Sequence, residues 1–295
     1  PSTSEANTLA AATSGIISAT ISEGDLATLN DLTETNKAYS ITITDTRVNA
    51  DELNALNDKT TTNINGSNIT QIAGAVEDIA TTYTAGGITG LGDEEVIFTF
   101  ANINADSLNA IDAANSRVIN ASGVAALTGT AADLNTAYAS LGISGLGDEP
   151  VTLTDTSLSA SVLNTLDDNT SGTVNAGSVS TLSGAAADLN TAYGSSGISN
   201  LGDEAITLTD ISLAVSVLNT LDGNTSGTID ASSINTLSGT AADLNTAYTA
   251  NGNGSITGLG NEAVTLSNTS LAVSVLNNLD GLTSGTINAS SLNAI

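Results

Sequence analysis

Residues 146–200 read LGDEPVTLTDTSLSASVLNTLDDNTSGTVNAGSVSTLSGAAADLNTAYGSSGISN, and much of the remaining chain repeats this stretch. Its opening Leu-Gly-Asp-Glu occurs 55 residues earlier and 55 residues later, and a Leu-Gly-Asn-Glu variant begins at Leu259. Self-similarity at a fixed period of this length is typical of proteins built from stacked repeats. We therefore expect one continuous domain, with an irregular start (1–35), four repeats (36–90, 91–145, 146–200 and 201–258) and a partial fifth repeat (259–295).

Each repeat predicts two strands, and a helix is expected after each strand. Residues 151–155 and 173–175 alternate β-branched and polar side chains, which favours strands. Apolar residues follow at helical spacing, first at Leu158, Val162, Leu163 and Leu166, then at Val179, Leu182, Ala186, Leu189 and Tyr193. Gly184 interrupts the second stretch and predicts a turn before a short helix. Thr130 and Thr240 each precede an Asp by three residues, which is the spacing of a helix N-cap.

This order predicts an α/β solenoid, in which strand–helix coils stack with a parallel sheet and each 55-residue repeat forms two coils. Eleven strand positions would give a sheet roughly 50 Å long. The alternative is an all-β right-handed parallel β-helix, in which the Leu-rich stretches are strands. The i, i+4, i+8 spacing of the Leu residues favours helices. The Leu-Gly-Asp-Glu segment is expected to be an added loop, because Ile41 follows Tyr39 closely without it.

The composition excludes most kinds of active site. The 295 residues include 31 Asp and Glu but only four Lys and Arg, and no His, Cys, Met or Trp, so the net charge is −27. Without His and Cys there is no Ser-His-Asp triad, Cys-His pair, disulfide or ordinary zinc site. Proteins that bind nucleic acids or anionic membranes do so through Lys and Arg side chains. This chain has no Lys or Arg after Arg117. We expect no enzymatic activity, no resident cofactor and no nucleic-acid partner.

The chain contains no run of about 18 apolar residues, so we expect no membrane span. Neither end resembles the polar cap of a solenoid, since the start is irregular and the last residues, up to Ile295, stop within a repeat. Uncapped coils expose core residues and strand edges. We therefore expect the chain to be a segment of a longer array, or to stack end to end on its neighbours.

Two kinds of acidic segment are candidate calcium sites. An Asp-x-Asn-x-Ser-Gly pattern, typical of the start of a calcium loop, offers Asp167, Asn169, Ser171, Asp222, Asn224 and Ser226. The distal Glu of an EF-hand is missing, and a polar turn after a helix is the alternative. Paired carboxylates, which would bind calcium between coils or chains or remain a solvated acidic loop, occur at Asp148, Glu149, Asp203 and Glu204.

Two other recurring patterns have structural explanations. Thr-x-Thr at 152–154 and 207–209 is similar to the Thr ranks of ice-binding solenoids, but the intervening coils depart from this pattern and an outward strand face is the favoured explanation. Asn residues recur beside Leu at equivalent places in the repeats, where stacked copies would satisfy backbone groups. They are Asn54, Asn164, Asn219, Asn277, Asn135, Asn190 and Asn245.

The repeat sequences resemble those of a known group of proteins. GISGLGDEPVTLTDTSLSASVLNTLDDNTSGTV (142–174), followed by TLSGAAADLNTAY (181–193), resembles tandem-repeat arrays of large acidic secreted or cell-surface proteins of bacteria, notably marine cyanobacteria. The likeness covers residues 36–295. It implies an extracellular structural or adhesive role, and it assigns no catalytic residue.

The sequence thus predicts a structural protein that forms, or lies within, an extracellular filament, sheath or surface stalk through end-to-end or lateral self-association. The alternative is a calcium-dependent adhesin or binding module, with calcium or a surface polysaccharide as its partner. An ice-binding solenoid is less favoured. A polysaccharide-acting enzyme is also less favoured, because such lyases generally use a basic residue and the chain after Arg117 has none.

Overall fold

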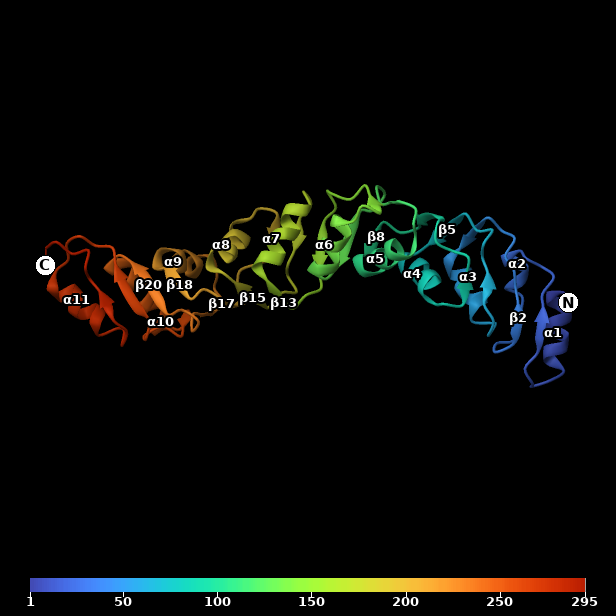
Figure 1. The fold of residues 1–295 in the computed structure, drawn as a ribbon, viewed down its shortest axis with the longest axis horizontal. Helices are drawn as coiled ribbons and strands as arrows, with labels where there is room; N and C mark the ends of the chain where they lie inside the picture. Colours follow the sequence, from blue (N-terminus) through green and yellow to red (C-terminus); the bar gives the residue numbers. More distant parts are fainter. Residues whose placement is uncertain (295) are drawn as a thin grey trace. The chain divides into compact units, whose positions relative to one another are not determined.

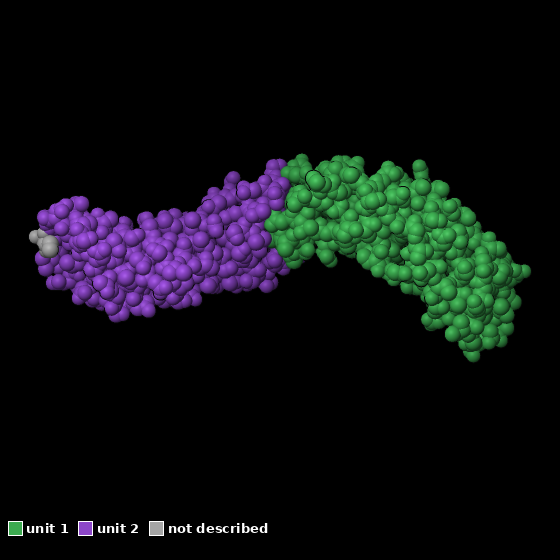
Figure 2. All heavy atoms as spheres, viewed as in Figure 1, with its two compact units in different colours: residues 1–150 green, residues 151–295 purple. Residues whose placement is uncertain are grey.

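The computed structural model describes residues 1–294, in which short β-strands alternate with α-helices (Figure 1). The chain forms two compact units, residues 1–150 and residues 151–295, coloured separately in Figure 2. Strands pair in parallel within both units, and within residues 1–294 no sheet closes into a barrel. The predicted α/β class is confirmed, whereas the all-β alternative is excluded because the Leu-rich stretches contain helices. The prediction of one continuous domain with five repeat boundaries stays a prediction.

Unit 1 begins with a helix and then alternates strands and helices. Its helices are α1 (Thr3–Ala11), α2 (Leu26–Leu29), α3 (Ala50–Asn57), α4 (Val76–Thr84), α5 (Ala105–Ala114) and α6 (Ala131–Ala139). Its strands are β1 (Ser18–Thr20), β2 (Ala38–Ser40), β3 (Arg47–Asn49), β4 (Ile64–Asn65), β5 (Gln71–Gly74), β6 (Ile88–Thr89), β7 (Glu95–Phe98), β8 (Asn102–Asn104), β9 (Ile119–Asn120), β10 (Ala126–Gly129) and β11 (Ile143–Ser144). The hydrogen-bonded rows are β1–β2, β3–β5–β7, β4–β6, β8–β10 and β9–β11.

Unit 2 has the same alternation. Its helices are α7 (Ala160–Asn169), α8 (Ala186–Gly194), α9 (Val215–Asn224), α10 (Ala241–Asn253) and α11 (Val273–Asp280). Its strands are β12 (Val151–Leu153), β13 (Ser157–Ser159), β14 (Val174–Asn175), β15 (Thr181–Gly184), β16 (Ile198–Ser199), β17 (Ala205–Leu208), β18 (Ser212–Ala214), β19 (Ile229–Asp230), β20 (Thr236–Gly239), β21 (Ile256–Thr257), β22 (Ala263–Leu266) and β23 (Ile287–Asn288). The rows are β12–β14–β16, β13–β15–β17–β19–β21 and β18–β20–β22–β23.

Apolar residues in register form the core of each unit. On β13, β15 and β17 the Cα partners are Leu158, Leu182 and Ile206, and all three side chains are buried. From α2 to α6 and from α7 to α11, consecutive helices pack side by side, and their Leu residues, such as Leu163 and Leu189, are fully buried. Burial of each such side chain stabilises the fold by about 1.5–3 kcal/mol. The core is therefore a row of similar residues, one from each successive strand–helix segment.

The helices are shorter than the apolar spacing predicted. Leu158 and Leu182 were expected on helices but lie on β13 and β15, and the helices begin at Ala160 and Ala186. Every second side chain of the strand points inward, and the helix that follows buries its apolar face against the same core. The apolar residues of strand and helix therefore continue one i, i+4 pattern. Gly184 ends β15, and α8 begins two residues later, in agreement with the predicted interruption.

The predicted single sheet is divided into several rows. The expected strands at Val96, Val151, Ile206 and Val264 form, whereas Ile41 lies beside an isolated bridge between Thr42 and Asn65. In unit 2, β17 joins the row of β13 and β15, and β18 then starts another row before the next helix. The segment between α8 and α9 therefore carries one strand more than the segment between α7 and α8.

Helix N-termini are capped in two ways. Thr130 and Thr240 accept the N–H of Asp133 and Asp243, as the spacing predicted. Helix α8 has no side-chain cap of its own, but its first N–H, on Ala186, donates to Asp210 at 2.7 Å. Asp210 comes from the segment that follows β17, so this cap joins one pass of the chain to the next.

Candidate functional site

The most regular polar feature of the structure is the glutamate of the Leu-Gly-Asp-Glu segment. Each copy, at Glu94, Glu149, Glu204 and Glu262, is at most 3 % exposed. A carboxylate taken out of water must be compensated by hydrogen-bond donors. These four residues therefore cannot belong to a freely solvated acidic loop.

A tyrosine from the preceding helix supplies one donor to each glutamate. The Tyr193 hydroxyl donates to Glu204 at 2.8 Å, and the Tyr248 hydroxyl donates to Glu262 at 2.7 Å. Equivalent bonds join Tyr83 to Glu94 and Tyr138 to Glu149. We call each such pair a Tyr–Glu clamp.

Backbone N–H groups of the same loop supply further donors. Gly202 donates to both carboxylate oxygens of Glu204, at 3.2 and 3.0 Å. Around Glu262 the N–H groups of Gly260 and Asn261 converge in the same way, at 2.8–3.0 Å. The loop thus folds back on its own glutamate, and the tyrosine fastens it to the helix.

A residue from the turn after the next helix completes the clamp. Thr283 donates its hydroxyl hydrogen to the Glu262 carbonyl at 3.1 Å. In the second repeat this position is Asn115, whose amide donates to both Tyr83 and the Glu94 carbonyl, at 3.0 and 2.8 Å. Each of these two clamps therefore ties together a helix, a loop and a later turn.

The clamp changes the tyrosines chemically. Burial is the largest cause that raises the pKa of Tyr83, Tyr193 and Tyr248 above the usual value, and the neighbouring glutamate adds to it. These three tyrosines therefore stay neutral at ordinary pH and act as hydrogen-bond donors to their glutamates.

The sequence predicted paired carboxylates at 148–149 and 203–204, and the structure separates the two members of each pair. Asp148 and Asp203 are exposed, whereas Glu149 and Glu204 are buried and bonded to tyrosines. The interpretation as a solvated acidic loop is wrong for the glutamates. Their partners were visible in the sequence only as a fixed spacing of 11 residues from tyrosine to glutamate in three of the four copies.

The Asp-x-Asn-x-Ser segments have protein partners in several directions. Asp167 accepts from the Ser195 hydroxyl at 2.6 Å, Asn224 donates to Asn190, and Ser226 donates to the Gly202 carbonyl. Asn169 ends α7, with Ser171 two residues beyond it, and Asp222 lies in the last turn of α9. Within residues 1–294 no group of three or more Asp, Glu, His or Cys side chains could hold a metal ion. Calcium binding remains an untested prediction.

The other recurring residues have structural positions. Thr152 and Thr207 are exposed on β12 and β17, as expected of an outward strand face, but their Cα partners on the next strands are Asn175 and Asp230. Asn54, Asn164 and Asn219 each donate to a backbone carbonyl of the following helix, at 2.9–3.0 Å. The predicted satisfaction of backbone groups by these three Asn residues is thus observed.

No helix within residues 1–294 combines the length and apolarity required to cross a membrane. Comparison with protein-family models, with curated proteins and with solved structures finds no match for this chain. The function must therefore be inferred from the residues themselves.

Proposed function

We propose that this chain is a structural repeat protein without enzymatic activity, which forms or belongs to an extracellular filament, sheath or surface stalk. Its architecture is an α/β solenoid, with two strand–helix coils in each 55-residue repeat. The observation that carries the proposal is the Tyr–Glu clamp, which recurs in four copies with the same kinds of donor.

The clamp supports a structural role because it links parts of the chain that follow one another in the stack. Strand pairing has the same property, since β17 bonds to β15 on one side and to β19 on the other. Further repeats can then be added with no new type of contact, as in other repeat proteins. Coils of this kind would continue from one chain to the next in a filament.

The charge favours an elongated material over a compact aggregate. The Asp of every Leu-Gly-Asp-Glu copy is exposed, at Asp93, Asp148 and Asp203. Most of the chain contains no Lys or Arg to balance this charge. Like charges oppose lateral association until salt or divalent cations screen them. The resemblance of the repeats to secreted bacterial arrays supports an extracellular place. A calcium-dependent adhesin remains the alternative function, with these exposed Asp residues as its ligands.

Negative-stain electron microscopy of the purified chain, once with calcium and once with chelator, tests the proposal. Fibres in both conditions are expected for end-to-end stacking. Fibres only with calcium favour the adhesin, and dispersed monomers in both conditions contradict self-assembly. The matched control replaces Asp93, Asp148 and Asp203 by Asn, which removes these three exposed charges but leaves each clamp intact. This variant should still assemble in chelator.

A further inference from the structure

One strand pairing that recurs in the third, fourth and fifth repeats is missing in the second repeat. Val151 donates its N–H to the Thr173 carbonyl at 2.9 Å, and this bond recurs between Ile206 and Thr228 and between Val264 and Thr286. The counterparts in the second repeat are Val96 and Val118. In the described part of the chain no backbone hydrogen bond joins these two residues, and β7 and β9 belong to different sheets.

A substitution at one glycine position of the repeat opposes this pairing. A Cβ atom on Gly227 would lie 1.9 Å from the Glu204 carbonyl oxygen, and one on Gly285 would lie 2.0 Å from the Glu262 carbonyl oxygen. The backbone can approach this closely only at glycine. In the first repeat the same position is Thr62, and within residues 1–294 Ile41 likewise donates no backbone bond to Asn63, although Ile43 still donates to the Asn65 carbonyl at 2.9 Å. In the second repeat the position is Arg117, whose Cβ opposes the close approach seen at Gly227 and Gly285.

The second repeat also lacks the residue that would cap the preceding helix. Asp210 caps α8 from the segment after β17, and Asn268 caps α10 in the same way. The counterpart of these residues is Phe100, which is 66 % exposed, and α4 has no side-chain cap of its own. Departures of this kind from a local rule are expected at functional sites.

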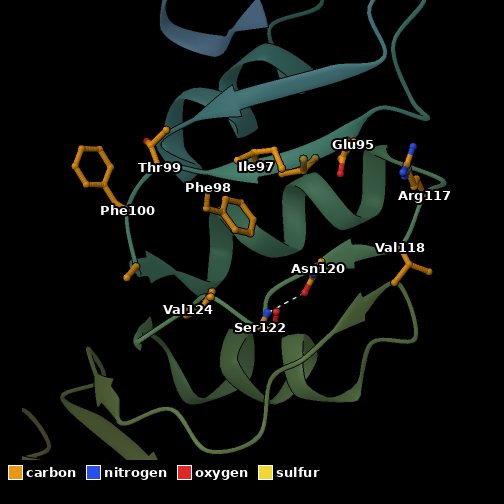
Figure 3. A pocket seen from close by; sticks show the side chains of 13 residues that line it. Glu95, Ile97, Phe98, Thr99, Phe100, Arg117, Val118, Asn120, Ser122 and Val124 are labelled. Carbon is orange, nitrogen blue, oxygen red and sulfur yellow. Dashed lines mark hydrogen bonds between the residues drawn. The ribbon is translucent and has the colours of Figure 1, made fainter. Parts of the chain in front are cut away.

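A cleft lies where the pairing is missing. Its volume is about 520 Å³, within the usual range for small-molecule sites. Figure 3 shows the Phe98 ring pointing into the space between the segment that contains β7 and the segment that contains β9, whereas Phe100 points away from it. The walls are mixed: Ile97 and Val118 are exposed apolar residues, and Asn120 is an exposed amide.

Arg117 lies at the edge of this cleft and has no acidic partner. Within residues 1–294 its guanidinium forms no ion pair, although the chain has 31 acidic residues. The adjacent Glu95 instead accepts a hydrogen bond from Gln71 at 2.8 Å. A planar guanidinium matches a carboxylate with two parallel hydrogen bonds. At physiological salt, exposed charges farther than about 8 Å from Arg117 are largely screened, so among the acidic residues that the structure describes Glu95, which lines the same cleft, is the one that opposes an anion there.

We propose that the cleft between β7 and β9 binds a carboxylate attached to a six-membered ring. Arg117 pairs with the carboxylate, and the ring lies against Phe98 and Val118. The Val96 N–H, freed from strand pairing, and the Asn120 amide offer hydrogen bonds to ring substituents. The ring is that of a uronic acid sugar or of an aromatic acid. This binding does not depend on filament formation.

Chemical-shift titration of the ¹⁵N-labelled full chain tests the site with two probes, D-glucuronate and benzoate. Saturable shifts at the amides of residues 95–100 and 117–124 are expected with at least one probe. The probe that binds more tightly identifies the sugar or the aromatic source. D-glucose and benzyl alcohol, which lack the carboxylate, should bind at least tenfold more weakly. Shifts that are absent from these residues, or equal for charged and uncharged probes, overturn the proposal.

Variants separate the roles of the arginine. Arg117→Gln keeps a Cβ and therefore the open cleft, so it should weaken carboxylate binding at least tenfold and leave Val96 amide exchange fast. Arg117→Gly should restore the strand pairing, slow exchange of the Val96 amide and abolish shifts with both probes. Arg47→Gln is the matched control, because Arg47 is exposed on β3 and does not line this cleft. Unchanged binding in Arg117→Gln, or lost binding in Arg47→Gln, contradicts the assignment.

Discussion

The Tyr193 hydroxyl donates a hydrogen bond of 2.8 Å to the buried carboxylate of Glu204, eleven residues further along the chain. The helix α8 presents the tyrosine, and the loop before β17 presents the glutamate. This relationship recurs in four copies, so its energetics determine how firmly each loop is held to its helix.

Tyr193→Phe should destabilise unit 2 by about 1–3 kcal/mol, because Glu204 loses a donor while it stays buried. The matched control is Tyr39→Phe. The Tyr39 hydroxyl is buried without a partner, so its removal should be neutral or stabilising. Urea unfolding followed by circular dichroism measures both variants. Equal effects of the two substitutions would show that the clamp does not stabilise the loop.

Alkaline pH should destabilise the protein. The folded structure raises the pKa of Tyr83, Tyr193 and Tyr248, so the folded state keeps these protons more tightly than the unfolded state does. The stabilisation is fully present below the unfolded pKa of about 10 and is lost as the pH rises above it. Tyrosinate absorbance should therefore rise together with unfolding. Full tyrosine ionisation near pH 10 in a folded chain would disprove this.

The glycine at position 227 should be sensitive to a single methyl group. Gly227→Ala places a Cβ against the Glu204 carbonyl and should cost roughly 1–3 kcal/mol. Gly223 lies inside α9, where an added methyl group would meet open space, so Gly223→Ala should stabilise the helix by about 0.5–1 kcal/mol. Thermal unfolding of the two variants compares them directly. The same sign of change in both would argue against the steric explanation for Arg117.

The cap between Asp210 and α8 should have a measurable effect. Asp210→Ala should destabilise unit 2 by about 1 kcal/mol, because the Ala186 N–H loses its acceptor. Thr209→Ala, an exposed neighbour, should change stability by less than about 0.5 kcal/mol. Hydrogen exchange at the start of α8 locates the effect. Unchanged protection of the Ala186 amide in Asp210→Ala would mean that water replaces the cap without loss.

Much of the local structure could be predicted from the sequence. The alternation of β-branched residues located strands such as β7, β12 and β17, and the Leu spacing located helices such as α7. Thr130 and Thr240 were recognisable as N-caps because a cap and its helix are neighbours in the chain. These features depend on backbone preference and side-chain periodicity over a few residues, which the sequence states directly.

Contacts between successive passes of the chain were decided only by the tertiary structure. An exposed Asp203 and a buried Glu204 are adjacent in sequence, and only the position of Tyr193 separates their environments. Likewise, the counterparts of Arg117 in later repeats, Gly227 and Gly285, lie against a carbonyl oxygen of an earlier loop, so an arginine at this position opposes the same close contact. The sequence by itself determined the repeat and its strands and helices. Which polar groups are buried, and where the strand pairing is lost, depends on how closely successive strand–helix segments approach one another. That distance is a property of the stacked fold and not of any short segment.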